Sequence, residues 1–204
     1  MRPPISQRIV KPENCVIAFG IPTCAPAFQR HLTLKRDFAS NYMLLQRYSL
    51  YVISVFDKLK PALLDLGVQI QTDVTLKQFG DLFDGKFDVV ILFAHWLNDQ
   101  VEFDDGFADV PKIVVEIKSG FNGLLDLCVC HPRNLVAALQ VERQNLLIKS
   151  LYQERATPRL WLYFYVALFT YLRDHQATYL QALEVLTVEM HRKIRRVKGS
   201  DKFT

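Results

Sequence analysis

The stretch Phe87-Asp88-Val89-Val90-Ile91-Leu92-Phe93-Ala94 is almost entirely apolar and leads directly into His95. A second stretch of the same kind, Leu124-Leu125-Asp126-Leu127-Cys128-Val129, leads into Cys130. Short runs this rich in branched and aromatic residues are typical of strands buried on both faces, as in a parallel sheet. Ligands bind such sheets at the carboxyl ends of the strands. If the two strands are neighbours, about 4.8 Å apart, a histidine and a cysteine emerge side by side at that edge.

The rest of the chain alternates predicted strands and helices. Further strands are expected at 16–20, 68–71 and 146–150, and helices at 38–66, 75–83, 110–117, 135–139, 158–172 and 177–195. We expect Pro61 to interrupt the first of these helices and Gly67 to end it. The helix at 110–117 lies in the crossover that two parallel neighbouring strands require. This order predicts an α/β fold with a doubly wound, mostly parallel sheet, helices on both faces and a helical C-terminal end.

Length and charge limit the possible organisation. The 204 residues fit a single domain, 1–204. The net charge is +4, but the segment 191–204 carries six cations and one carboxylate, so the remainder is nearly neutral. Such a basic tail could contact nucleic acid, lipid or an acidic partner. Cations also suit the negative end of a helix dipole. We favour this second interpretation and expect no nucleic-acid partner.

The cysteines and the apolar segments indicate the compartment. The four cysteines stand at positions 15, 24, 128 and 130, and no secretory signal pattern precedes them. Without export, the thiols are expected to be reduced. The most apolar stretch, 160–172, would form a helix of about 20 Å, shorter than the hydrocarbon core of about 30 Å. The sequence therefore predicts a soluble, cytoplasmic protein with no membrane span.

His95 and Cys130 have the chemistry of a base and a nucleophile. A thiol attacks as its thiolate, so it needs a depressed pKa or an adjacent base. Histidine suits that role because its pKa lies near neutrality. We expect Cys130 to be the nucleophile and His95 to be the base and then the acid. The backbone N–H groups of Cys130 and Trp96 would form the oxyanion hole.

The order of these residues resembles the caspase–hemoglobinase group, which includes caspases, separase, clostripain, gingipains and the prokaryotic CHAT domains. That group places its histidine after the third core strand and its cysteine after the next strand. The resemblance covers about residues 14–190 and includes Phe93-Ala94-His95, the helix-bearing crossover and Leu127-Cys128-Val129-Cys130. The segment Tyr179-Leu180-Gln181-Ala182-Leu183-Glu184 is similar to the helix that ends CHAT-like domains. The resemblance implies a caspase-like cysteine endopeptidase that cleaves protein or peptide substrates through an acyl-enzyme.

Some positions depart from the family pattern. The family usually has a glycine directly after the histidine, where Trp96 stands here. It usually has a small or polar turn after the cysteine, where His131 and Pro132 stand here. The segment 152–158 is too short for the interdomain linker of maturing caspases, so self-cleavage is not expected. The alternative is a catalytically inactive caspase-like adaptor or regulatory module, and either form could bind a protein activator or partner subunit.

Acidic residues gather shortly after His95. They are Asp99, Glu102, Asp104 and Asp105. The aspartates could line a substrate pocket for a basic side chain, although we favour a solvated loop. Asp126 lies too far along its strand to orient His95, so a nearby backbone or helix N-terminus is expected to hold it.

The residues near the two strand ends also allow a metal site as an alternative. Cys128, Cys130, His131 and His95 could be taken for a metal cluster, but they lack the cysteine spacing of structural zinc sites. Cys128 is instead expected to be buried against a helix. No glycine-rich phosphate-binding motif is present. The sequence therefore predicts neither a metal nor a cofactor.

Overall fold

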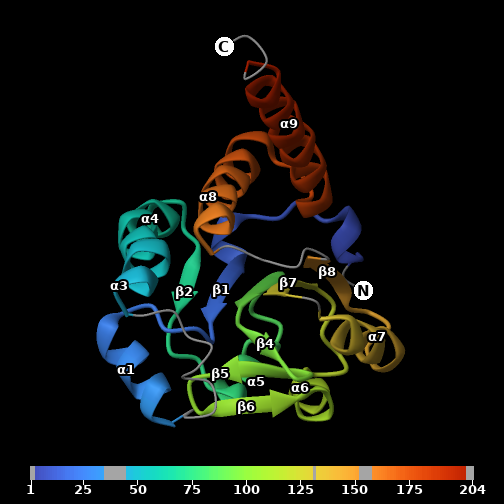
Figure 1. Cartoon of the computed structure of the whole chain (residues 1–204). Coiled ribbons are helices and arrows are strands. Elements are labelled where there is room, and N and C mark those ends of the chain that lie inside the picture. Colours follow the sequence, from blue (N-terminus) through green and yellow to red (C-terminus); the bar gives the residue numbers. More distant parts are fainter. Residues whose placement is uncertain (1–2, 35–44, 131, 152–157, 201–204) are drawn as a thin grey trace.

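Five parallel strands form the central sheet of the computed structural model (Figure 1). In order across the sheet they are β2 (Gln69–Gln71), β1 (Cys15–Phe19), β3 (Val89–Phe93), β7 (Leu124–Cys130) and β8 (Leu147–Leu151). Every neighbouring pair is parallel. β3 and β7 are neighbours, as their sequences predict. The structure describes residues 3–34, 45–130, 132–151 and 158–200, and the side chains of the last helix only as far as 189.

Helices cover both faces of the sheet, which confirms the predicted doubly wound α/β fold. One face packs against α4 (Ser54–Asp65) and α8 (Pro158–His175). The other face packs against α5 (Leu76–Asp81), α6 (Val110–Glu116) and α7 (Arg133–Glu142). Alternation of side chains along each strand separates two apolar cores. In β7, Cys128 belongs to the core under α8, whereas Leu127 and Val129 belong to the opposite core.

Further helices lie around this framework. They are η1 (Ile5–Gln7), η2 (Pro12–Asn14), α1 (Ala25–Leu34), α3 (Leu45–Tyr48), the π-helical turn η3 (Ser49–Ile53) and α9 (Tyr179–Ser200). The start of α9 buries Tyr179 and Ala182 in the core, and Figure 1 shows its other end extending away from the body. The side chains of the basic tail lie outside the described residues. Within the described ranges, no helix combines the length and hydropathy needed to cross a membrane.

The prediction that Pro61 interrupts its helix is wrong, because α4 continues through Pro61 to Asp65. A proline inside a helix removes one backbone hydrogen bond. Leu59 and Leu63, on either side of it, are buried in the core, and this packing offsets the loss. Gly67 ends the helix as predicted, with a φ of 88° that favours glycine. Part of the predicted helix, residues 38–44, lies outside the described residues.

An antiparallel sheet of three strands follows β3, where the sequence favoured a solvated loop. Its strands are β4 (Trp96–Leu97), β5 (Gln100–Phe103) and β6 (Gly106–Asp109). The loop prediction is wrong because two tight turns fold the segment back on itself. Asn98 and Asp99 have φ values of 50° and 60°. Positive φ at both central residues is the requirement of a type I′ hairpin turn.

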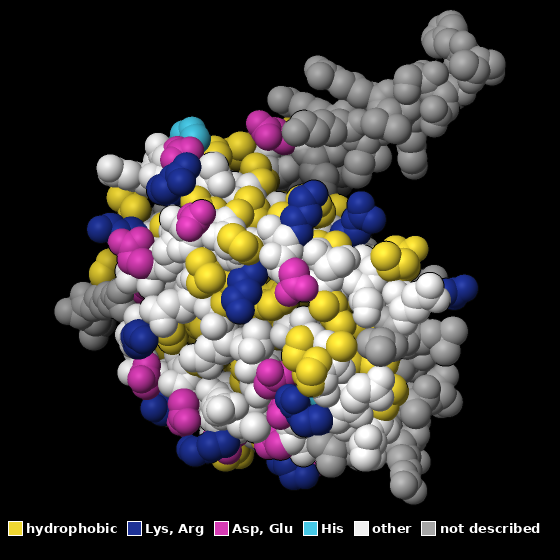
Figure 2. Space-filling view, turned by 90° about the vertical axis from the view of Figure 1, so that its left-hand side faces the viewer, with side chains coloured by type: hydrophobic (Ala, Val, Ile, Leu, Met, Phe, Trp, Pro, Cys, Tyr) yellow, Lys and Arg dark blue, Asp and Glu magenta, His cyan; other side chains and the backbone are white. Residues whose placement is uncertain are grey.

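Apolar side chains are exposed on the side of the molecule that carries α1 and α4. Figure 2 shows hydrophobic side chains there, interspersed with charged ones. Large exposed apolar residues on η3 and α4 are Leu50, Tyr51 and Leu64, and those on α8 are Leu160 and Tyr163. The charges between them divide the apolar surface of this side.

Candidate active site

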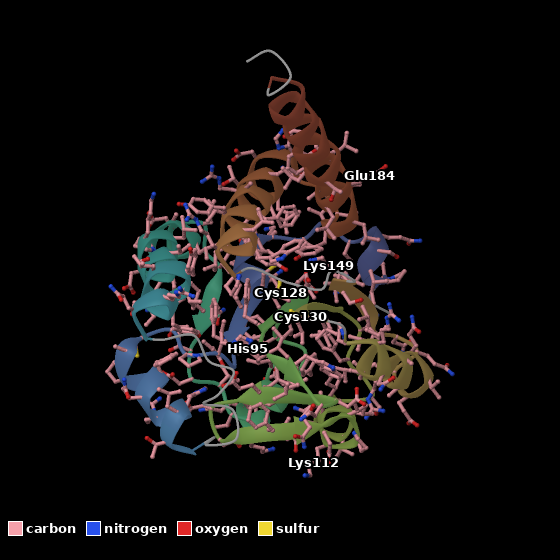
Figure 3. The ribbon with its side chains drawn as sticks, in the orientation of Figure 1. His95, Lys112, Cys128, Cys130, Lys149 and Glu184 are labelled. Carbon is pink, nitrogen blue, oxygen red and sulfur yellow. The ribbon has the colours of Figure 1, made fainter. Side chains whose placement is uncertain are left out.

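The carboxyl ends of β3 and β7 bring His95 and Cys130 to one cavity. Phe93 lies opposite Cys128 in the register, so His95 and Cys130 each stand two residues further along neighbouring strands. Both side chains line a cavity of about 20 Å³, which has room for about one water molecule. Figure 3 shows the two residues close to Cys128, below α8. The remaining lining residues are Ile21, Phe93, Ala94, Cys128, Pro158 and Trp161.

Cys130 and Cys128 differ in their burial, and only Cys130 is partly exposed. Cys128 is buried against α8, as predicted, and its Sγ lies 3.0 Å from the hydroxyl of Tyr165. Burial raises the pKa of Cys128 to about 12, so this thiol stays protonated at neutral pH. Cys130 is only partly buried and takes part in no disulfide bond. The His95 side chain is 43% exposed, so solvent and small reagents reach this end of the site.

The hairpin of β4 and β5 brings Glu102 back to His95. The backbone N–H of Glu102 donates to the carbonyl oxygen of His95 at 3.0 Å. The carboxylate oxygen Oε2 of Glu102 lies 4.0 Å from Nε2 of His95. Glu102 is completely buried. A buried carboxylate at this distance favours the imidazolium form of the histidine.

A second histidine contacts the other carboxylate oxygen of Glu102. Nδ1 of His31 lies 2.6 Å from Oε1 of Glu102, and both side chains are fully buried. Nε2 of His31 lies 3.1 Å from Oδ1 of Asp104, which also accepts a hydrogen bond from Arg30 at 3.3 Å. His31 and Arg30 both belong to α1. This helix therefore holds two carboxylates of the segment that follows His95.

The peptide unit between His95 and Trp96 has its carbonyl group turned toward β5. Among the described residues every peptide bond is trans. In a trans unit the N–H points away from the C=O. The N–H of Trp96 therefore points away from Glu102 and β5. This orientation is compatible with the oxyanion role expected for Trp96 from the sequence.

A buried polar cluster adjoins the cavity. Asp126 accepts hydrogen bonds from Nζ of Lys149 at 2.7 Å and from the hydroxyl of Tyr179 at 2.8 Å. Lys149 also donates to the Tyr165 hydroxyl at 3.3 Å, and its Nζ lies 4.6 Å from the ring centroid of Trp161. The prediction that a backbone group or helix N-terminus holds Asp126 is therefore wrong. Side chains of β8 and α9, distant in the sequence, hold it instead.

The three aspartates that could line a substrate pocket have partners within the chain. Asp99 accepts a hydrogen bond from Asn134 at 3.0 Å, and Asp105 accepts one from the N–H of Leu76 at 3.1 Å. Asp104 contacts the side chains on α1. None of the three is among the described residues that line the cavity at His95 and Cys130.

The described residues contain no cluster of three or more histidine, cysteine, aspartate or glutamate side chains arranged for a metal ion. His131, one member of the zinc alternative, lies outside the described residues. The segment 152–157, discussed above as a short loop, lies outside them too. Pro132 precedes α7 as its N-cap residue.

The fold and the site together define an α/β protein with a cysteine and a histidine at the carboxyl edge of a parallel sheet and a buried glutamate beside the histidine. Comparison with known protein families found no family model that matches the chain, and no curated protein has a matching sequence. The chemistry of the site must therefore be inferred from its own residues.

Sequence reasoning missed the positions of Glu102 and His31. The signal for Glu102 was the pair Asn98-Asp99 between two short apolar runs, a pattern that predicts a two-residue hairpin. Once Leu97 pairs with Gln100, position 102 falls opposite His95. His31 offered no comparable signal, because 71 residues separate it from Glu102.

Proposed function

We propose that this protein is a caspase-like cysteine endopeptidase that acts through His95 and Cys130. The observation that carries the proposal is that both residues line one cavity at the carboxyl ends of adjacent parallel strands. The substrates are proteins or peptides. The reaction needs no cofactor, and we place it in the cytoplasm.

The reaction follows from the chemistry of the two side chains. His95 takes the proton of Cys130, and Sγ attacks the carbonyl carbon of the scissile peptide bond. The N–H groups of Trp96 and Cys130 stabilise the oxyanion that forms. Collapse of this intermediate breaks the C–N bond, and the leaving amine takes the proton from His95. Water, deprotonated by His95, then hydrolyses the thioester and restores the thiol of Cys130.

The alternative function is that of a catalytically inactive adaptor or regulatory module. The small size of the cavity, about 20 Å³, favours this alternative. Pro158 and Trp161 from α8 form one wall of it. The exposed apolar residues of α4 and α8 offer a surface for a partner in either case.

The proposal is tested by peptide cleavage. The full chain is incubated with a peptide library made from a digested proteome, and new termini are identified by mass spectrometry. We expect cleavage by the wild type and by Cys24→Ser, and loss of cleavage in Cys130→Ala and His95→Ala. The intact mass should also reveal a thioester on Cys130 when activated esters are supplied. Absence of both products from the wild type would favour the adaptor, and cleavage that persists in Cys130→Ala would overturn the assignment of the nucleophile.

A further inference from the structure

We propose that Glu102 is the positioning residue of His95, holding the neutral imidazole with its proton on Nε2 so that Nδ1 is left to accept the proton of Cys130. The inference rests on the proposed function, because it assigns a role within the same site. Glu102 does not line the cavity, and it acts through His95.

Two links join Glu102 to His95. One is the backbone hydrogen bond of 3.0 Å from the Glu102 N–H to the His95 carbonyl, which fixes the backbone beside the imidazole. The other is the distance of 4.0 Å between Oε2 of Glu102 and Nε2 of His95. This is an ion-pair distance, and catalytic contacts are often longer in the free protein than in the substrate complex. Both links come from one residue of β5, so the hairpin couples the position of the carboxylate to that of the histidine.

The carboxylate of Glu102 is itself oriented by His31. Nδ1 of His31 contacts Oε1 at 2.6 Å, which leaves Oε2 as the oxygen directed to His95. The other ring nitrogen of His31 contacts Asp104 at 3.1 Å. Both ring nitrogens of His31 therefore contact carboxylate oxygens, and these two contacts orient its ring between Glu102 and Asp104.

The charged and titratable groups of this cluster come from several elements. They are Arg30 and His31 on α1, Tyr48 on α3, Asp73 before α5, His95 after β3, Glu102 on β5 and Asp104 after β5. Burial raises the pKa of Tyr48 and the charge of Glu102 raises it further, so this hydroxyl stays protonated. It donates to the carbonyl of Pro22 at 2.7 Å. Histidine is the side chain of this cluster whose ordinary pKa lies near neutrality.

A carboxylate beside Nε2 has two consequences for His95. It favours the tautomer with the proton on Nε2, because only an N–H can donate to an ionised carboxylate. It also stabilises the imidazolium that forms when His95 takes the proton of Cys130. The second effect favours transfer of the proton from Cys130 to His95.

The test is the titration of His95 in the full-length protein, followed by long-range ¹H–¹⁵N NMR, together with the pH profile of Cys130 alkylation by iodoacetamide. The variants are Glu102→Gln and the control Glu184→Gln, which removes an exposed carboxylate on α9 (Figure 3). In Glu102→Gln we expect the midpoint of His95 to fall by about one pH unit and Cys130 alkylation at pH 7 to slow about tenfold. The control should leave both unchanged.

The proposal is overturned if His95 keeps its midpoint in Glu102→Gln. If Glu102→Gln does not fold, the NMR spectrum of the wild type decides. The proposal requires that the neutral imidazole of wild-type His95 carries its proton on Nε2. A proton on Nδ1 overturns the proposal. Failure of the proposed function looks different. An absence of peptide cleavage with the His95 midpoint shifted as expected would remove the peptidase and leave the positioning role. Peptide cleavage with an unchanged His95 midpoint would support the peptidase and overturn the positioning role of Glu102.

Discussion

The backbone N–H of Glu102 donates a hydrogen bond of 3.0 Å to the carbonyl oxygen of His95. This bond closes the β4–β5 hairpin against the end of β3. On its other side, the carbonyl of Glu102 packs against Gly20 at the end of β1, where an added Cβ would lie 2.3 Å from the carbonyl oxygen. The site therefore depends on the close approach of β1, β3 and the hairpin.

An alanine at position 20 must displace the backbone of Glu102. We expect Gly20→Ala to lower the free energy of unfolding by about 1–3 kcal/mol, the usual cost of overpacking, and to slow alkylation of Cys130. Gly120→Ala is the matched control, because a Cβ there meets no atom within 4 Å. Urea unfolding measures the stability of each variant. A Gly20→Ala variant as stable as the wild type would contradict the close approach.

The sequence was sufficient to predict the central sheet and the pair of His95 and Cys130 at its carboxyl edge. β3 and β7 are short, continuous apolar runs, which are typical of the central strands of a parallel sheet. Their ends then place His95 and Cys130 together, because the register of two parallel neighbours aligns equivalent ends. The end of the α4 helix at Gly67 was also predicted correctly, and the positive φ of this residue is a conformation that favours glycine.

The parts that escaped prediction depend on contacts between distant segments. Proline usually breaks a helix, so the local sequence predicts a break at Pro61. The helix continues because the residues around Pro61 pack into the core. Asp126 is held by Lys149 and Tyr179, which the sequence does not mark as its partners. In the sequence Glu102 is one of several acidic residues after His95, and only the hairpin register shows that it lies beside His95. Its partner His31 follows only from the packing of α1 against the hairpin.

Buried thiols and phenols predict sensitivity to alkaline pH. Burial is the largest cause that raises the pKa of five such groups, which are Cys15, Tyr48, Cys128, Tyr165 and Tyr179. In the unfolded chain these groups ionise near their ordinary values of 9.0 for cysteine and 10.0 for tyrosine. In the folded protein they keep their protons to higher pH, and Cys128 does so until about 12.

The unfolded state therefore binds fewer protons than the folded state above about pH 9, and stability must fall as the pH rises. Each group contributes a slope of up to about 1.4 kcal/mol per pH unit within its window. We expect the free energy of unfolding, measured in urea from pH 8 to 11, to decrease steadily, with a smaller slope in Cys128→Ser. Stability that stays constant over this range would contradict the burial of these groups.

The pairing of His95 with Cys130 is tested most directly by the alkylation rate of each cysteine at pH 7, resolved by mass spectrometry in the native protein. Cys24 is the internal reference, because its burial is intermediate, like that of Cys130, and it takes part in no disulfide bond. We predict that Cys130 reacts fastest of the four cysteines, and that His95→Ala slows it about tenfold or more while Cys24 keeps its rate. A Cys130 that reacts no faster than Cys24, or whose rate is the same in His95→Ala, would contradict the dyad.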